Sequence, residues 1–333
     1  MIAASRYRFL KRAMMGLLLM FAAIAPASAQ LSADAWPPKT VRILVPFGPG
    51  STPDIVARLV SDGLAKKYPD SVFLVENKPG ASGNLATDMV AKAAPDGSTL
   101  GVSIGGPLAI NTLLFSQLPY DPRTDIAPIT QLVTQPSALA VNPQLGVNNI
   151  AKLIALLKKN PGKYNFSSIG NGSLSHLAIE AIELKTGAKL VHVPYSSSPQ
   201  AITAVIRNDA QMGCLPAISV TPHATAGTVK ILAVSTAKRS PFLPDVPTLM
   251  ESGIDVEADA WNGLIAPGST PKDIVAKINR DVVDIIRQPA VREKLAAQLM
   301  EPIGSSPEEF RAHIDGEINR WGPVVKAAKI TAN

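Results

Sequence analysis

The chain has 333 residues, enough for one large or two medium-sized domains with a full hydrophobic core. It carries 32 Lys and Arg against 26 Asp and Glu, a formal net charge of +6. Four of the basic residues and no acidic residue lie in the first 29 positions, so the remainder has 28 basic and 26 acidic residues. A net charge of +2 is poor support for nucleic acid or an anionic membrane as a partner.

The first 29 residues have the pattern of an export signal. Basic residues at positions 6, 8, 11 and 12 precede an apolar run over residues 13–25, and Ala27-Ser28-Ala29 fits a cleavage site. The apolar run is short for a membrane span, although a retained N-terminal anchor is the alternative. We therefore predict that residues 1–29 are a signal peptide, that Gln30 begins the mature chain, and that the protein is periplasmic.

The cysteine and histidine content argues against a metal site. Cys214 is the only cysteine, so no intramolecular disulfide and no thiolate cluster can form. The histidines show no close ligand pair of the HExxH kind. We predict no metal and no cofactor. The four histidines are His176, His192, His223 and His313.

A strand, a glycine turn and a helix open the mature chain. The apolar run 41–45 predicts a buried strand, Gly48-Pro49-Gly50-Ser51 a turn, and residues 55–67 a helix, with Thr52 as its N-cap. A helix N-terminus offers free N–H groups and a positive dipole end, which favour an anion. Asp54 would repel that anion, so we expect it to point away, hold a bridging water or meet an ammonium group.

Strands and helices alternate in both halves of the chain. In the first half, strands at 41–45, 72–75 and 99–103 alternate with helices, which predicts a parallel sheet. A second series restarts near residue 137, and Gly170-Asn171-Gly172-Ser173 repeats the strand, turn and helix order of the first turn. Two α/β domains follow, with ligands expected beyond the carboxyl ends of strands. The strand predicted at 261–267 could return the chain to the first domain, followed by three helices.

Motifs for catalysis are weak. Neither glycine turn completes a dinucleotide fingerprint, and no phosphate-binding loop or Gly-x-Ser-x-Gly elbow is present. Ser173 or Ser175 with His176 could be used by a secreted α/β hydrolase, but no aspartate is evident to orient the histidine. We therefore predict a protein that is not an enzyme. Cys214 reads as a small buried residue, and the run 195–198 as either a polar turn or part of a ligand site.

Several motifs, in order along the mature chain, resemble the Bug receptors. These are the periplasmic solute-binding proteins of tripartite tricarboxylate transporters. The resemblance rests on the runs at residues 45–58, 76–84, 120–122, 170–178, 192–195, 237–241, 243–248 and 261–267.

The resemblance implies a two-lobed α/β periplasmic-binding-protein fold of the Venus-flytrap type II class, with a ligand cleft between the lobes. We expect residues 30–135 and 262–333 to form lobe 1 and residues 136–261 to form lobe 2. The implied partners are a small carboxylate and the membrane permease subunits, and the protein is expected to be a monomer. A ligand sensor for a signalling partner is a further alternative that shares the fold.

The resemblance also implies a set of ligand-binding residues. Ser51 replaces a frequent glycine, Ser196-Ser197 replace a common Lys-Gly, and Cys214 stands where many members carry Asp. Losing that Asp makes an amino acid less favoured than a mono- or dicarboxylate, possibly aromatic. The implied residues are Phe47, Gly48, Gly50, Ser51, Thr52, Asp54, Ser82, Gly83, Ser103, Ser168, Gly170, Asn171, Gly172, Ser173, His176, Tyr195 and Cys214.

Overall fold

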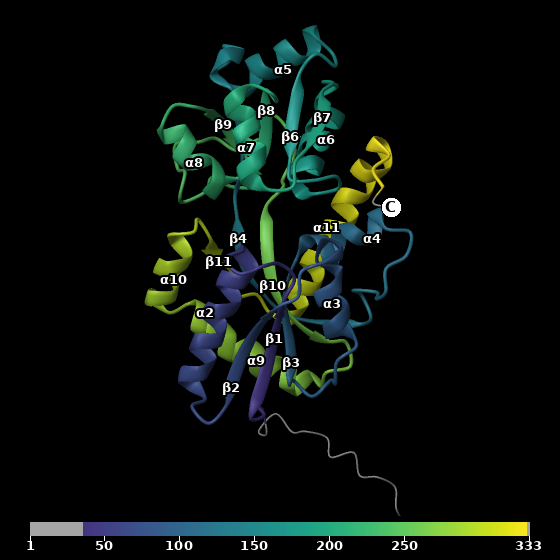
Figure 1. Ribbon diagram of the computed structural model, residues 1–333, viewed down its shortest axis with the longest axis vertical. Coiled ribbons are helices and arrows are strands. Elements are labelled where there is room, and N and C mark those ends of the chain that lie inside the picture. The colour runs from purple at the N-terminus through teal and green to yellow at the C-terminus, as the bar shows by residue number, and fades with distance from the viewer. Residues whose placement is uncertain (1–35, 332–333) are drawn as a thin grey trace, which may run out of the picture.

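Two β-sheets organise the chain into two lobes, which are stacked along the long axis of the molecule (Figure 1). The computed structural model describes residues 36–331, so the predicted signal peptide lies outside the described residues. The first sheet has six strands in the order β11-β4-β10-β3-β1-β2, and the second has five in the order β7-β6-β8-β5-β9.

Lobe 1 is built on a mixed sheet. β1, β2 and β3 are parallel, as predicted, whereas β10 runs antiparallel between β3 and β4 and returns the chain to this sheet. The short β11 separates two of the last three helices, which were expected without a strand between them. The elements are β1 (Thr40–Val45), α2 (Thr52–Lys67), β2 (Val72–Asn77), α3 (Asn84–Ala91), β3 (Thr99–Ile104), η3 (Gly106–Ile110), α4 (Asn111–Leu114), β4 (Ile126–Gln135), β10 (Ala260–Pro267), α9 (Lys272–Ile286), α10 (Pro289–Ala296), β11 (Glu301–Pro302) and α11 (Pro307–Ala328).

Lobe 2 repeats this plan with a second mixed sheet. β6 is parallel to β7 and β8, and β5 is antiparallel to β8 and β9. The helix α8 was not predicted from the sequence. The elements are β5 (Ser137–Val141), α5 (Ile150–Lys159), β6 (Asn165–Ser168), α6 (Leu174–Thr186), β7 (Val191–Pro194), α7 (Ser198–Arg207), β8 (Met212–Pro216), α8 (Ala217–Thr225) and β9 (Lys230–Val234).

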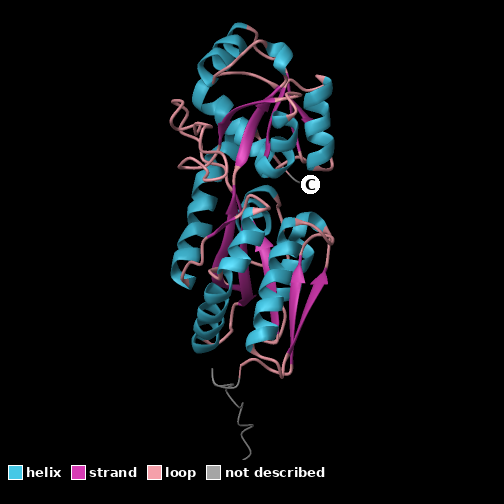
Figure 2. Ribbon diagram, turned by 90° about the vertical axis from the view of Figure 1, so that its left-hand side faces the viewer, coloured by secondary structure: helices cyan, strands magenta, loops and turns pink. Residues whose placement is uncertain are grey.

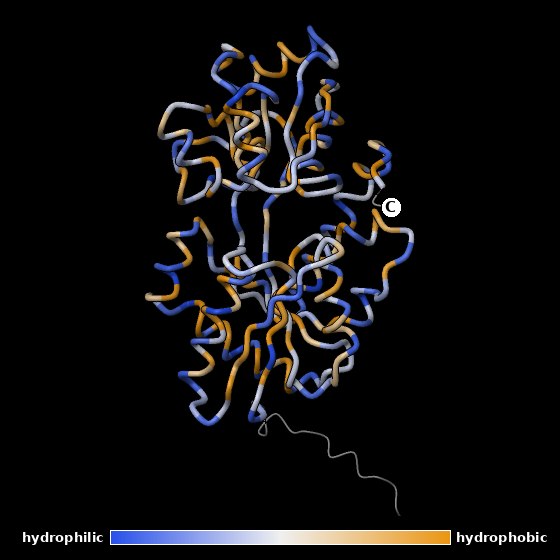
Figure 3. Tube along the Cα trace, in the orientation of Figure 1, coloured by the Kyte–Doolittle hydropathy of each residue, from blue (hydrophilic) through white to orange (hydrophobic). Residues whose placement is uncertain are grey.

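Apolar burial explains why these segments adopt their structures. Val41, Ile43, Leu44 and Val45 of β1 are all fully buried, as expected for a central strand covered on both faces. α9 buries one helical stripe that packs into the same core as β1. Hydrophobic segments gather inside each lobe, and polar segments lie at the outer turns (Figure 3). No helix within residues 36–331 combines the length and apolar composition needed to cross a bilayer.

Three segments connect the lobes. The chain leaves the first sheet at Gln135 and returns to it at Ala260, two residues before the expected boundary. α11 starts against β4, but Trp321 in its last turns joins the core of lobe 2, next to α6 (Figure 1). Leu114 of α4 joins the same core from lobe 1. The end of the chain therefore packs with lobe 2, although lobe 1 was expected to hold it.

The contact between β10 and α11 generates a stability prediction. A Cβ at Gly263 would overlap the buried ring of Phe310, whereas one at Gly316 on α11 meets nothing. We expect Gly263→Ala to lower the free energy of unfolding by about 1–3 kcal/mol through overpacking. Gly316→Ala should leave it unchanged or raise it by about 0.5–1 kcal/mol. Chemical denaturation of both variants measures this, and equal effects would contradict the packing argument.

Candidate functional site

The carboxyl ends of β1 and β6 point toward the opposite lobe. β1 runs upward from the start of the described chain, and β6 runs downward from α5 (Figure 1). The side view also shows strands of the lower lobe with their arrowheads toward the upper one (Figure 2). Each of these two strands leads into a Gly-x-Gly-Ser turn and then a helix, α2 or α6. The two turns singled out in the sequence therefore lie on the sides of the lobes that face each other.

The turn of lobe 1 is a tight loop that ends at the helix N-cap. The Ser51 N–H donates to the Gly48 carbonyl at 3.2 Å, and Gly50 has a φ of +81°, which favours glycine. Ser51, not Thr52, is the N-cap, so that prediction was wrong by one residue. The Ser51 hydroxyl makes no capping hydrogen bond, and its buried oxygen finds no partner among the described residues.

Asp54 is buried, and its carboxylate oxygens accept hydrogen bonds from within the protein. It is only 2% exposed, and its Oδ2 accepts from the Gly50 N–H at 2.9 Å. Arg58 and the Asn77 amide donate to its Oδ1, each at 2.9 Å. Burial raises the pKa of this carboxyl, but the hydrogen bonds from Arg58, Gly50 and Asn77 together hold it below its usual range. Of the three expected roles, pointing away from the ligand matches this geometry.

The turn of lobe 2 is bonded in the same way. The Ser173 N–H donates to the Gly170 carbonyl at 3.2 Å, and Gly172 has a φ of +72°. Ser173 is the N-cap, and its hydroxyl donates to the Gly170 carbonyl at 2.6 Å. A side chain at Gly172 would overlap Leu114 of α4, so this turn touches lobe 1 closely.

His176 lies beneath the turn with both ring nitrogens engaged. Its Nδ1 accepts from the Gly172 N–H at 3.0 Å, and its Nε2 lies 3.3 Å from Oε1 of Glu180. The ring is 4% exposed and stacks on His192, with centroids 3.7 Å apart and planes at 10°. His176 was expected to bind the ligand, but its two hydrogen-bonding atoms already face partners within the protein.

His192 forms a serine–histidine pair that the sequence did not suggest. Its Nε2 lies 2.6 Å from the hydroxyl oxygen of Ser168. Burial, and then the neighbouring His176, lower the pKa of His192 to about 4, which makes it a weak base at neutral pH. Ser168 is fully buried and also accepts from the Gly170 N–H at 3.1 Å. The pair therefore supports the turn and lacks the exposed serine that a hydrolase needs.

The other expected residues of lobe 1 differ in exposure. Ser82 is exposed, with a φ of +55°, and Gly83 is buried beside Pro46. The Phe47 carbonyl accepts from the Asn77 amide at 2.7 Å. Ser103 is 2% exposed and bonds Thr87 at 3.0 Å, so its hydroxyl belongs to the core of lobe 1.

The other expected residues of lobe 2 also separate into exposed and buried groups. Asn171 is exposed and donates its side-chain amide to the Thr331 carbonyl at 2.9 Å. Cys214 is fully buried in the core, and burial raises the pKa of its thiol to about 12. The thiol is therefore neutral and has no surface to offer a ligand.

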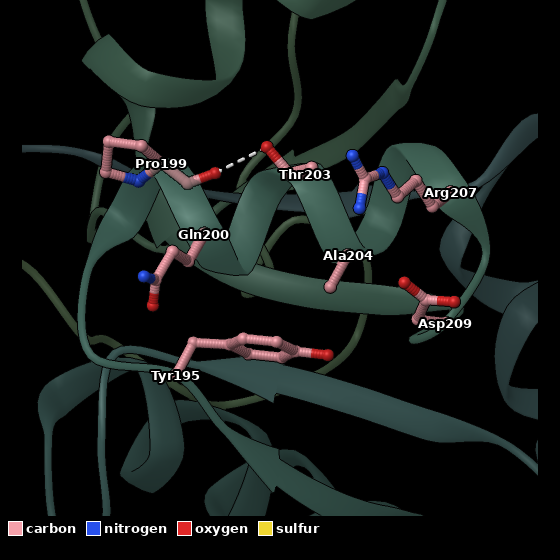
Figure 4. Close-up of a pocket in the computed structure, with 7 residues that line it drawn as sticks. All are labelled: Tyr195, Pro199, Gln200, Thr203, Ala204, Arg207 and Asp209. Atoms are coloured by element: carbon pink, nitrogen blue, oxygen red, sulfur yellow. Dashed lines mark hydrogen bonds between the residues drawn. The ribbon is translucent and has the colours of Figure 1, made fainter.

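Tyr195 lines a surface pocket on the α7 side of lobe 2 (Figure 4). The pocket has a volume of about 380 Å³, and its other lining residues belong to α7 and the turn after it, including Arg207 and Asp209. The Tyr195 ring lies along this helix. None of the residues that line this pocket belongs to the glycine turns, although the Tyr195 N–H donates to the carbonyl of Ser168, which precedes the turn of lobe 2, at 2.9 Å.

Hydrogen bonds and ion pairs connect α11 to the segment that returns the chain from lobe 2 to lobe 1, which includes Glu257 and Trp261. Glu317 accepts from the indole N–H of Trp261 at 3.3 Å and from that of Trp321 at 3.1 Å. Arg320 bridges Glu317 at 2.9 Å and Glu257 at 2.8 Å. Within residues 36–331, no group of three His, Cys, Asp or Glu side chains is arranged to hold a metal.

Two α/β lobes whose glycine turns face each other define a solute-binding protein of the bilobal class. The family model described as tripartite tricarboxylate transporter family receptor matches residues 56–330, and the chain belongs to this family. This confirms both the resemblance to the Bug receptors and the two-lobed fold. The family and its solved relatives are binding proteins of the periplasm.

The relatives match this chain along most of their length. BugT of Bordetella pertussis is 34% identical over 314 residues, which cover 92% of this chain and 94% of BugT. The structure of R. palustris Rpa4515 with adipate has a TM-score of 0.78 and 33% identity, over 89% of this chain and 99% of that one. MatC from Rhodopseudomonas palustris with bound malate has a TM-score of 0.73 and 32% identity, over 87% and 100%. None of these matches supports the hydrolase alternative.

Asp259 lies directly before β10, on the segment that returns the chain to lobe 1, and its pKa predicts how stability depends on pH. Burial, and then the carboxylates of Glu257 and Glu317, raise the pKa of Asp259 to about 8. The folded protein therefore holds a proton that the unfolded chain, with an aspartate pKa of about 3.9, has lost, and stability falls as pH rises through this window. We expect Asp259→Asn to gain stability over the wild type above about pH 8 and to show no gain near pH 4.

Chemical denaturation across this pH range tests the prediction. Asp255→Asn is the matched control, because Asp255 is exposed and its hydrogen bond with Lys185 lowers its pKa. That variant should gain nothing at high pH. A pH-independent effect of Asp259→Asn would rule out the buried proton.

Proposed function

We propose that the chain is a periplasmic receptor that captures a small carboxylate between its lobes and presents it to the permease of a tripartite tricarboxylate transporter. The observation that carries this proposal is the pair of matching Gly-x-Gly-Ser turns, one at the start of α2 and one at the start of α6. Residues 1–29 are proposed to direct export, and the receptor is proposed to act as a monomer.

Helix N-termini suit this task because their first N–H groups have no acceptor within the helix. The dipole of each helix adds a partial positive charge at the same end. Neither residues 47–54 nor residues 168–176 contain a lysine or arginine. An anion held by neutral donors avoids the cost of separating a desolvated ion pair, which suits capture followed by release.

The ligands of the solved relatives favour a dicarboxylate. One solved relative is in complex with adipate and another with malate, two acids that differ in length and in a hydroxyl group. These two relatives have similar sequence identity to this chain but hold different acids. They therefore indicate the class of ligand, and they do not indicate which acid this chain binds. Adipate and malate are accordingly the first probes to use.

We propose direct ligand contacts for the residues at the two turns. The Ser51 hydroxyl is the strongest candidate, because its buried oxygen has no partner among the described residues. First-turn N–H groups of α2 and α6, the turn residues from Phe47 to Thr52 and from Gly170 to Ser173, and the exposed Ser82 complete the proposed set. Asp54, Ser103, His176 and Cys214 are left out, because their polar atoms are paired or buried in the protein.

Direct binding measurements on the mature protein test the function. We expect adipate, malate or a related mono- or dicarboxylate to raise the thermal unfolding temperature and to give a saturable calorimetric signal, whereas the corresponding dimethyl esters give neither. Turnover of a chromogenic ester with no binding of any acid would instead support a hydrolase.

Ser51→Ala tests the ligand contact separately from folding. Since the Ser51 hydroxyl makes no capping bond, its loss should leave stability within about 0.5 kcal/mol of wild type and weaken carboxylate affinity about tenfold. Ser306→Ala is the control, because Ser306 caps α11 in a full capping box. It should cost about 1 kcal/mol of stability without changing affinity. Unchanged affinity in Ser51→Ala would remove Ser51 from the site.

A further inference from the structure

The two turns match beyond their glycines. Each reads Gly-x-Gly-Ser-x-x and then a side chain that accepts a hydrogen bond: Asp54 in lobe 1 and His176 in lobe 2. In both, the third helical residue accepts from the N–H of the glycine four positions earlier, at 2.9 Å in lobe 1 and 3.0 Å in lobe 2. The two unrelated side chains therefore occupy one structural position.

This bond differs from an ordinary capping box, of which the chain has an example. In α11, Glu309 is the third helical residue and accepts from the N–H of the N-cap residue, Ser306, at 2.8 Å. In the two turns, the N-cap N–H is already bonded to the carbonyl of the first glycine. The third helical residue reaches one residue further back and secures the second glycine, whose φ is positive.

Securing that glycine has a direct consequence for an anion site. Glycine has the largest conformational freedom to lose, so an unsecured turn would have to be ordered when the ligand binds. A side chain that holds the turn in advance removes this cost and fixes the direction of the neighbouring first-turn N–H groups. Both side chains are themselves held, Asp54 by Arg58 and Asn77, and His176 by stacking on His192.

We propose that Asp54 and His176 are matched positioning residues, which hold the two turns in the shape that binds the carboxylate. The inference rests on the proposed function. It assigns to the two residues a role through the backbone, without contact to the ligand.

The two acceptors are different chemical groups in the same place. The Gly172 N–H needs a lone pair on Nδ1 of His176, so the ring proton lies on Nε2, facing Glu180. The other ring neighbours are His192 on β7 and the neutral Phe166 on β6. In lobe 1 a carboxylate oxygen of Asp54 accepts the corresponding bond from Gly50. The role therefore requires an acceptor atom at this position and does not require one particular side chain.

The experiment compares four variants of the mature protein with wild type. His176→Asn places an amide oxygen near the position of Nδ1 and keeps an acceptor there, whereas His176→Ala and Asp54→Ala remove the acceptors. Glu309→Ala is the matched control, because it removes an equivalent acceptor far along the chain. Calorimetry with adipate and malate measures affinity. Hydrogen exchange of ¹⁵N-glycine amides without ligand measures protection at Gly50 and Gly172, and thermal unfolding monitors the fold.

We expect His176→Ala and Asp54→Ala each to lose affinity about tenfold or more and to lose protection at their own glycine only. His176→Asn should keep affinity and Gly172 protection closer to wild type than His176→Ala does, because its amide oxygen can accept the same bond. Glu309→Ala should match wild type in affinity and glycine protection.

Other outcomes would overturn the inference. Wild-type affinity and protection in His176→Ala or Asp54→Ala would show that these side chains do not position the turns. A loss of affinity and Gly172 protection in His176→Asn as large as in His176→Ala would contradict the acceptor role of the ring. If wild type binds neither acid, the proposed function fails for these probes, and the glycine protection still decides whether the two side chains hold the turns.

Discussion

The proposed anion site depends on one constraint, which is the direction of the backbone N–H groups at two helix N-termini. Such groups attract an anion only if they keep one direction, because a mobile turn would pay the ordering cost on binding. The strands β1 and β6 deliver the turns to opposing sides of the lobes, and side chains from below hold each turn in place. The fold therefore serves to keep a few neutral donors aligned.

This constraint also resolves the conflict posed by a carboxylate beside an anion site. Asp54 is ionised, but its charge is compensated by Arg58 and by donors from Gly50 and Asn77. What remains toward the turn is a fixed set of dipoles with little net negative charge. In lobe 2 an imidazole nitrogen of His176 accepts the corresponding bond, so the two halves of the proposed site reach one geometry with different side chains.

The connections between the lobes limit how they can move. Besides the two chain connections between the sheets, α11 begins in lobe 1 and ends in the core of lobe 2, where Trp321 belongs to the same hydrophobic cluster as Leu177 of α6. Glu317 connects this helix to β10 by accepting a hydrogen bond from the indole N–H of Trp261. A hinge motion must then occur at the few residues beside these contacts, since packed cores move as units. The turn at Gly172 lies close to Leu114 of lobe 1, so a hinge motion between the lobes would change this contact.

Local order was readable from the sequence alone. Apolar runs, glycine turns and caps depend on neighbours within a few residues, so the strand, turn and helix units, their repetition in two halves and the family resemblance followed directly. Tertiary structure decided the roles of single side chains. Asp54 is paired with Asn77, 23 residues away, and His176 of α6 stacks on His192 of β7. Such a pairing depends on which distant segment lies alongside, and no local pattern encodes that.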